Sequence, residues 1–364
     1  MKHRPEKEVV KALVKITRYT IFVSLLLVLA MMIFSGYVFS LRGGMAAGQN
    51  LSPVNATPHA ALAAPADATT AGTEKPLPPG VWKAPDAATI PAGKQGEMIR
   101  YGKELLAHTA QYFGPKGSIA QITNGMNCQN CHLDAGTRIF GNNYAGFIAS
   151  YPKISSRSGK MSPASARIAE CFERSLAGKV PDTSSKEIQS ILAYMKWIGQ
   201  GVPKKAKLFG NATEKLAFMD VAADPAKGKA VFIQKCQNCH GKEGEGLLTA
   251  DKKEYQYPPL WGKHSYNDGA GMYRLGNFAG FVKNNMPYGA SYQNPQLTDE
   301  EAWNVAAFVN SRPRPHKDQH LDWTDADKKP IDFPFGPYAD HFSEKQHKFG
   351  PFKPIKEAQK NQSI

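Results

Sequence analysis

The sequence predicts a mainly α-helical protein, in which two copies of one small domain follow an N-terminal transmembrane helix and a flexible linker. Three observations support this fold class. Residues 19–41 carry no charge, one pentapeptide occurs twice, and each copy of it lies between segments with helical periodicity. The 364 residues are 42% apolar and 21% charged, which is typical of globular proteins and excludes a disordered chain.

The N-terminal segment predicts a membrane anchor. Residues 1–18 form a basic cytoplasmic segment, and the uncharged residues 19–41 would span about 34 Å as a helix. Basic residues remain on the cytoplasmic side, so the rest of the chain would lie in the periplasm, anchored to the cytoplasmic membrane. A cleaved signal peptide is the alternative, which would release the protein, but its apolar core is usually only about 7–15 residues long.

Residues 42–91 predict a flexible linker, because they are rich in Ala, Pro, Gly, Thr and Ser and have no apolar period. The net charge of +14 favours anionic partners. Nucleic acid is not expected among them, because the chain is expected to be exported and contains no motif that combines basic with aromatic side chains.

The pentapeptide CQNCH occurs at residues 128–132 and again at 236–240. The pattern C-x-x-C-H is the signature of haem c attachment, in which two thiols bind the haem covalently and the histidine ligates the iron. A redox dithiol does not need the histidine, and no further cysteine pair is present to complete a zinc site. The sequence therefore predicts two covalently bound haem c groups, with these thiols and imidazoles: Cys128, Cys131 and His132; Cys236, Cys239 and His240.

The segments around the two motifs repeat as well. Amphipathic helices are expected before them, over 95–113 and 227–235, and each contains a glycine, Gly102 or Gly228, that would let another helix approach closely. Later helices are expected to begin with the capping-box patterns Ser184–Glu187 and Thr298–Glu301.

This layout resembles the class I cytochrome c fold. We expect one such domain over 92–203 and a second over 220–313, each carrying one haem. Residues 204–219 would link them, and residues 314–364, which have no helical period, would form an extended C-terminal tail.

The far side of each iron needs its own ligand. In the second domain Met286 lies in a loop between Gly-rich turns and is the expected ligand; the alternative is a core-filling Met. The Pro258–Leu260 segment resembles the loop whose carbonyl orients the haem-ligating histidine, here His240. The first domain has no similar loop, and Met161 is a weaker candidate there than Cys171.

Cys171 lies on a helix expected over 163–176, starting at Ser162 and Pro163 and ending near Gly178. Arg167, Cys171 and Arg174 would share one face, with Ser175 next to them. A lone cysteine is usually a small buried apolar residue. Neighbouring arginines instead favour the thiolate form, which is both an iron ligand and a nucleophile.

These segments resemble the thiosulfate dehydrogenase family, exported dihaem cytochromes that join two thiosulfate ions into tetrathionate. The similarity runs from Trp82 to the end, and Cys171 with its flanks, RIAECFERS at 167–175, is its most specific part. The resemblance implies that His132 and Cys171 ligate haem 1, the active site. It implies also that electrons pass to haem 2, ligated by His240 and Met286, and then to an acceptor cytochrome or a membrane redox partner.

The resemblance also implies substrate-binding residues. Arg157 and Arg167 match positions that hold thiosulfate or tetrathionate, and Ser175 and Lys179 lie near them. Some family members carry a lysine directly before the haem 2 methionine; here the residue is Asn285. The reverse reaction, tetrathionate reduction, would use the same site.

Two other functions remain open at this point. A membrane-anchored dihaem electron carrier explains the anchor, the haems and the basic charge, but not a cysteine among arginines. A sulfur-carrier module of a multienzyme system would also have a Cys-ligated haem, and it would act through partner proteins.

Overall fold

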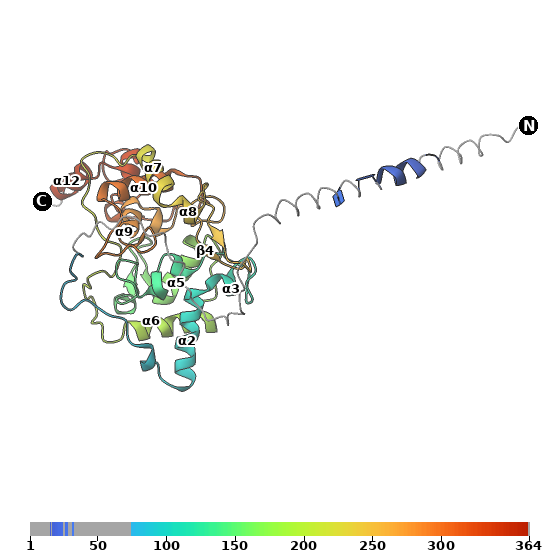
Figure 1. The fold of residues 1–364 in the computed structure, drawn as a ribbon. Coiled ribbons are helices and arrows are strands. Elements are labelled where there is room, and N and C mark those ends of the chain that lie inside the picture. Colours follow the sequence, from blue (N-terminus) through green and yellow to red (C-terminus); the bar gives the residue numbers. More distant parts are fainter. Residues whose placement is uncertain (1–14, 16, 25, 28–30, 33–73, 363–364) are drawn as a thin grey trace, which may run out of the picture. The chain divides into compact units, whose positions relative to one another are not determined.

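The computed structural model describes residues 15, 17–24, 26–27, 31–32 and 74–362. The chain divides into two units, Met1–Thr69 and Thr70–Ile364. The second unit is mainly helical, as predicted, and contains all the candidate site residues (Figure 1).

The prediction of a transmembrane helix over 19–41 is wrong for the part of the chain that the structure describes, where no helix is long and apolar enough to cross a bilayer. The helical residues described there are 19–24, 26–27 and 31–32, and the other positions lie outside the described residues. A spanning helix needs about 20 consecutive apolar residues, and no described run reaches that length. Most of the predicted basic segment 1–18 and residues 42–73 of the predicted linker also lie outside the described residues.

The first half of the second unit, residues 92–203, is built from short helices and one small antiparallel hairpin. In order its elements are α2 (Gly93–Ala107), α3 (Thr109–Phe113), η3 (Cys128–Asn130), α4 (Leu133–Gly136), η4 (Ile148–Ser150), β1 (Lys153–Ile154), β2 (Met161–Ser162), α5 (Ala164–Arg174) and α6 (Lys186–Ile198). In the hairpin, Lys153 pairs with Ser162 and Ile154 with Met161. Met161, the weaker ligand candidate, is 66% exposed on this hairpin.

The second half, residues 220–313, repeats the plan. Its elements are α7 (Pro225–Lys235), α8 (Gln237–His240), β3 (Leu247–Leu248), β4 (Tyr255–Tyr257), η5 (Gly271–Tyr273), α9 (Leu275–Asn285) and α10 (Asp299–Ser311). Strands β3 and β4 pair antiparallel with a register shift.

A glycine lies at the crossing of the first and last helices in both halves. A Cβ at Gly102 of α2 would overlap the carbonyl oxygen of Ser190 in α6, and a Cβ at Gly228 of α7 would overlap that of Asn304 in α10. The two helices of each pair therefore touch backbone to backbone. This is the close approach that the sequence predicts from these glycines.

The starts of the helices differ in detail from the prediction. Thr298 and Glu301 form the predicted capping box of α10. Helix α6 is capped by Ser185, whose side chain accepts from Ile188 N, and not by Ser184. Helix α5 begins at Ala164 after Pro163 and ends at Arg174, two residues before the predicted end. The left-handed conformation, with a φ of 42°, is taken by Ala177 and not by Gly178.

The segments flanking the two halves are more ordered than predicted. From Lys75 onwards the expected linker contacts the globular part, and Trp82 and Ile90 pack against the core of the first half. The C-terminal tail contains η6 (Ala326–Lys328), α11 (Glu344–Phe349) and α12 (Lys353–Gln362). The tail helices form because they bury apolar residues: Ile355 is fully buried, and Phe352 lies in the core of the second half.

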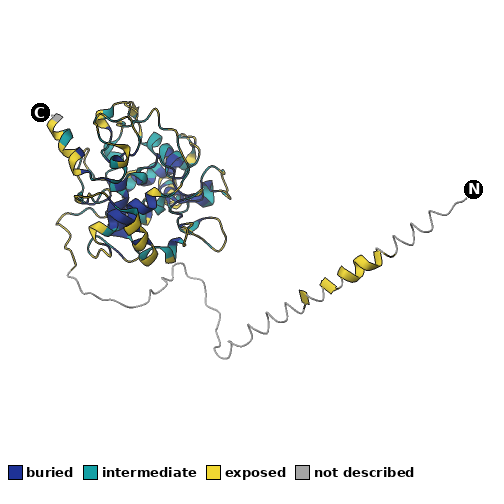
Figure 2. Ribbon diagram, turned by 90° about the horizontal axis from the view of Figure 1, so that it is seen from above, coloured by how far each residue is buried: buried dark blue, intermediate teal, exposed yellow. Residues whose placement is uncertain are grey.

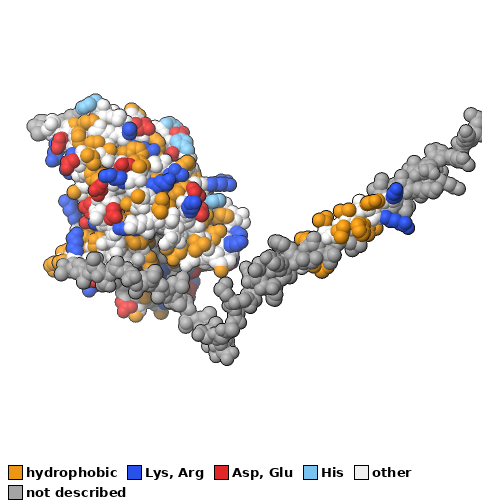
Figure 3. Space-filling model, turned by 45° about the horizontal axis from the view of Figure 1, so that its top comes forward, with side chains coloured by type: hydrophobic (Ala, Val, Ile, Leu, Met, Phe, Trp, Pro, Cys, Tyr) orange, Lys and Arg blue, Asp and Glu red, His pale blue; other side chains and the backbone are white. Residues whose placement is uncertain are grey.

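Each half has its own hydrophobic cluster, one around Phe172, Ile191 and Tyr194, the other around Phe232, Leu275 and Trp303. The buried residues gather at the centre of the second unit (Figure 2). On the face drawn in Figure 3, basic side chains lie dispersed among acidic and apolar ones.

Candidate active site

Hydrogen bonds hold the first CQNCH segment in place. Asn127 and Asn130 form a capping box at η3, and the Cys128 N–H donates to Thr109 Oγ1 at 3.0 Å. His132 Nδ1 donates to the carbonyl oxygen of Asn142 at 2.6 Å, and the imidazole stacks on a tyrosine ring, Tyr144, with centroids 4.4 Å apart. Because Nδ1 is occupied, Nε2 of His132 is the nitrogen available to a metal.

The donor set of this segment fits haem c. Burial raises the pKa of Cys128 and of Cys131 to about 12, and the nearby Cys171 adds to the rise. Neutral thiols are poor metal ligands, so direct metal binding by these two cysteines is disfavoured. Burial also lowers the pKa of His132 to about 4, with a smaller contribution from Arg167, so the imidazole is in the neutral form that binds a metal.

Helix α5 places Cys171 beside the first CQNCH segment. The Sγ of Cys171 accepts a hydrogen bond from Arg167 Nη1, one turn earlier, at 3.3 Å. Conversely, Cys171 is the main cause of a raised pKa of Arg167. The thiol is also near enough to Tyr144 to raise its pKa, in addition to the larger effect of burial.

Arg157 and Arg167 share one carboxylate. The Oε2 atom of Glu170 lies 3.2 Å from Arg157 Nη1 and 3.4 Å from Arg167 Nη1. Arg157 is more buried than Arg167, with side chains 16% and 35% exposed. Burial, then Arg174 and Arg167, lower the pKa of Arg157 to about 10, against the opposing effects of Asp322 and Glu170.

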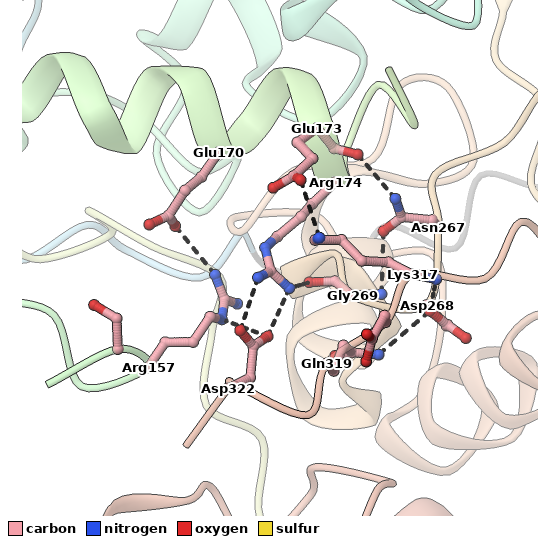
Figure 4. A network of polar contacts seen from close by, with 12 residues as sticks. Arg157, Glu170, Glu173, Arg174, Asn267, Asp268, Gly269, Lys317, Gln319 and Asp322 are labelled. Atoms are coloured by element: carbon pink, nitrogen blue, oxygen red, sulfur yellow. Dashed lines mark hydrogen bonds and ion pairs between the residues drawn. The ribbon is translucent and has the colours of Figure 1, made fainter. Parts of the chain in front are cut away.

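Arg174, which the helical pattern places on the same face as Cys171, has a different role. Its guanidinium donates two hydrogen bonds to Asp322, at 2.7 and 2.9 Å, and its side chain is 8% exposed (Figure 4). An arginine so buried, with both terminal nitrogens bound to Asp322, is not available to an incoming anion.

The structure shows no side-chain contact that ties Ser175 or Lys179 to the thiol or the arginines among the described residues. Ser175 caps α5, and its backbone N–H donates to the Cys171 carbonyl at 2.9 Å. Lys179 is exposed, and its backbone N–H donates to the carbonyl of Ile122. Among the residues the structure describes, its ammonium forms no ion pair. Both remain predictions.

The second CQNCH segment has a similar arrangement. His240 Nδ1 donates to the Pro258 carbonyl at 2.9 Å, so the prediction for this carbonyl is confirmed. Met286 follows α9 and packs against the core of the second half, as does Cys236. Its role as the second ligand of haem 2 stays a prediction.

The residues next to Met286 are engaged elsewhere. Asn285 is 2% exposed and donates to the carbonyls of Phe140 and Phe281. The Lys283 ammonium donates to the Leu297 carbonyl at 2.6 Å and pairs with Asp299 at 2.9 Å.

Sequence reasoning missed the acidic and aromatic residues around Cys171. Glu170 could have been noticed, because it lies next to Cys171 on the same helix. Tyr151 is close enough that Arg167 and Cys171 both act on its pKa, which burial raises to about 12. Asp322 lies in the C-terminal tail, where no local pattern marks it.

The sequence and the fold were compared with those of known proteins. Residues 225–313 match the cytochrome c family model. The chain is 39% identical over 235 residues to the thiosulfate dehydrogenase of Allochromatium vinosum, covering 64% of this chain and 83% of that protein. It is 36% identical to that of Psychrobacter arcticus, covering 71% and 77%.

The chain belongs to the thiosulfate dehydrogenase family. The predicted resemblance and the prediction of an enzyme of this class are therefore confirmed, and haem c is its expected cofactor. Among solved structures, thiosulfate dehydrogenase (TsdBA) of Marichromatium purpuratum superposes with a TM-score of 0.60 at 33% identity. That match covers 65% of this chain and half of the Marichromatium chain.

Proposed function

We propose that this protein oxidises two thiosulfate ions to tetrathionate at a site formed by Cys171, Arg157 and Arg167. The observation that carries the proposal is the contact between Cys171 Sγ and a guanidinium that lies beside a second guanidinium. Thiosulfate is a dianion, and two of them repel each other. Arginines offset this repulsion and give paired hydrogen bonds to sulfonate oxygens.

Cys171 is the proposed nucleophile, and the bonds that form and break follow from that role. Its thiolate and the outer sulfur of one thiosulfate form a sulfur–sulfur bond, with release of two electrons. The outer sulfur of the second thiosulfate attacks the adduct sulfur that is bonded to Cys171 Sγ. The bond to Sγ breaks, tetrathionate leaves, and the cysteine thiolate is regenerated. Arg167, in contact with Sγ, stabilises the thiolate at both ends of the cycle.

Two haem c groups would accept the electrons. His132 and Cys171 are the proposed ligands of haem 1, and His240 and Met286 those of haem 2, with attachment through Cys128, Cys131, Cys236 and Cys239. A redox protein would then take the electrons from the second half. We propose a periplasmic location, because the basic segment followed by uncharged residues has the order of an export signal.

The test is the haem absorption spectrum of purified protein on addition of thiosulfate alone. We expect the reduced spectrum to appear and tetrathionate to form, whereas sulfate, a similar dianion without an outer sulfur, leaves the oxidised spectrum unchanged. A pure electron carrier would stay oxidised with both anions, and that result would overturn the proposal.

A further inference from the structure

We propose that Asp322, in the C-terminal tail, is a positioning residue that holds Arg157 in place for substrate binding. The inference rests on the function proposed above. The C-terminal tail would then contribute a residue to the substrate site, a role that neither the sequence pattern nor the similarity to known proteins indicates.

Asp322 is the carboxylate that Arg174 and Arg157 share. Its side chain is 10% exposed, and its two oxygens accept from the two terminal nitrogens of Arg174. Oδ2 also lies 3.4 Å from Arg157 Nε. Figure 4 shows both guanidinium groups directed at the carboxylate of Asp322.

The two arginines need this carboxylate. Arg174 and Arg157 are close enough that Arg174 lowers the pKa of Arg157, which means that the two cations repel each other. Asp322 acts in the opposite direction and lies between them. Without it, the more exposed of the two, Arg157, would turn away towards water.

Hydrogen bonds and an ion pair hold the tail in place on both sides of Asp322. The next residue, Trp323, donates its backbone N–H to the Arg157 carbonyl at 2.6 Å, and its ring lies 5.9 Å from the Arg157 guanidinium. Earlier in the tail, Lys317 forms an ion pair with Glu173 of α5 at 3.0 Å, and its N–H donates to Asp268 at 2.8 Å. The carboxylate of Asp322 is therefore fixed relative to α5.

Glu170 contacts the same arginine in a different way. Its carboxylate is 28% exposed and contacts the terminal nitrogens of Arg157 and Arg167, the atoms that would bind an anion. Glu170 thus competes with an incoming anion for the terminal nitrogens of Arg157. Asp322 instead contacts Arg157 at Nε and leaves the terminal nitrogens free for the anion. Removing one negative charge should have opposite effects at the two positions.

The experiment compares Asp322→Asn with Glu170→Gln, each of which removes one carboxylate charge. We expect Asp322→Asn to raise the KM for thiosulfate by about tenfold, with kcat changed by no more than about twofold. Glu170→Gln should lower KM. Asp318→Asn is the matched control: it is in the same tail, 71% exposed and paired with His320, and it should leave KM unchanged.

A KM for Asp322→Asn that falls, as for Glu170→Gln, would show that only charge matters and would overturn the inference. An unchanged KM with a lower melting temperature would assign Asp322 to stability alone and would also overturn it. If wild-type protein neither binds nor oxidises thiosulfate, the proposed function fails first, and this outcome is distinct from both others.

Asp322→Asn removes the carboxylate paired with the buried Arg174 and could prevent folding. The double variant Asp322→Asn with Arg174→Gln removes both members of the buried pair and keeps the net charge, and Arg157 still loses its carboxylate. We expect the same rise in KM, together with weaker binding of inert sulfate in calorimetry. Wild-type sulfate affinity in this variant would contradict the positioning role.

Discussion

Arg167 joins the proposed nucleophile to the anion-binding site, because one of its nitrogens lies within 3.4 Å of both Cys171 Sγ and Glu170 Oε2. The side chain is 35% exposed, so it can still meet an anion from solvent. A sequence pattern can predict this pair, since residues one helical turn apart face the same way.

Replacing Arg167 with Gln keeps a hydrogen-bond donor but removes the cation. A hydrogen bond to a charged group contributes about 1.5–3 kcal/mol, so kcat/KM for thiosulfate should fall by about tenfold or more. Steady-state kinetics at low ionic strength would measure this. Arg138→Gln, which removes an exposed arginine paired with Asp134, is the control. Equal kinetics in both variants would place the substrate elsewhere.

At the scale of elements, the sequence predicted the helix pairs of both halves and the glycines at their crossings. These features are local, since periodicity and caps lie within a few residues of each other. Helix α6 is capped by Ser185 instead of Ser184, and helix α5 starts at Ala164 instead of Pro163. The sequence pattern does not resolve such shifts of one residue.

Gly102→Ala tests the crossing of α2 and α6. The added methyl group would overlap the Ser190 carbonyl, so the helices must separate, and we expect a loss of about 1–3 kcal/mol in the free energy of unfolding. Chemical denaturation would measure it. The control is Gly271→Ala, where the added methyl group meets open space and the backbone is unstrained. A Gly102→Ala protein as stable as this control would refute the backbone contact.

At the scale of the whole second unit, contacts between distant segments are what the sequence did not predict. Glu254 of the second half is buried and accepts from three residues of the first: His108, Gln111 and Asn127. Asp322 meets Arg174 across 148 residues of sequence. No periodicity or motif signals such pairs, because the partner of a charged residue depends on the packing of the complete fold.

Glu254→Ala should therefore weaken the connection between the halves. It leaves the buried side-chain amide of Asn127 without its acceptor, which costs about 1–3 kcal/mol. We expect a lower unfolding midpoint in denaturant, and Asp251→Ala, at an exposed position in the same loop, should leave the midpoint unchanged. A wild-type midpoint for Glu254→Ala would mean that the two halves are stable without this contact.

The central claim is that Cys171 carries out the chemistry, and Cys171→Ala tests it most directly. The substitution removes one partly buried sulfur and leaves both CQNCH segments and the arginines in place. We predict a folded protein that retains its haem, with a changed spectrum for haem 1, a normal spectrum for haem 2, and thiosulfate oxidation and tetrathionate reduction both at background. Turnover at even about a tenth of the wild-type rate, a loss of only about 1.4 kcal/mol in transition-state stabilisation, would contradict the covalent mechanism.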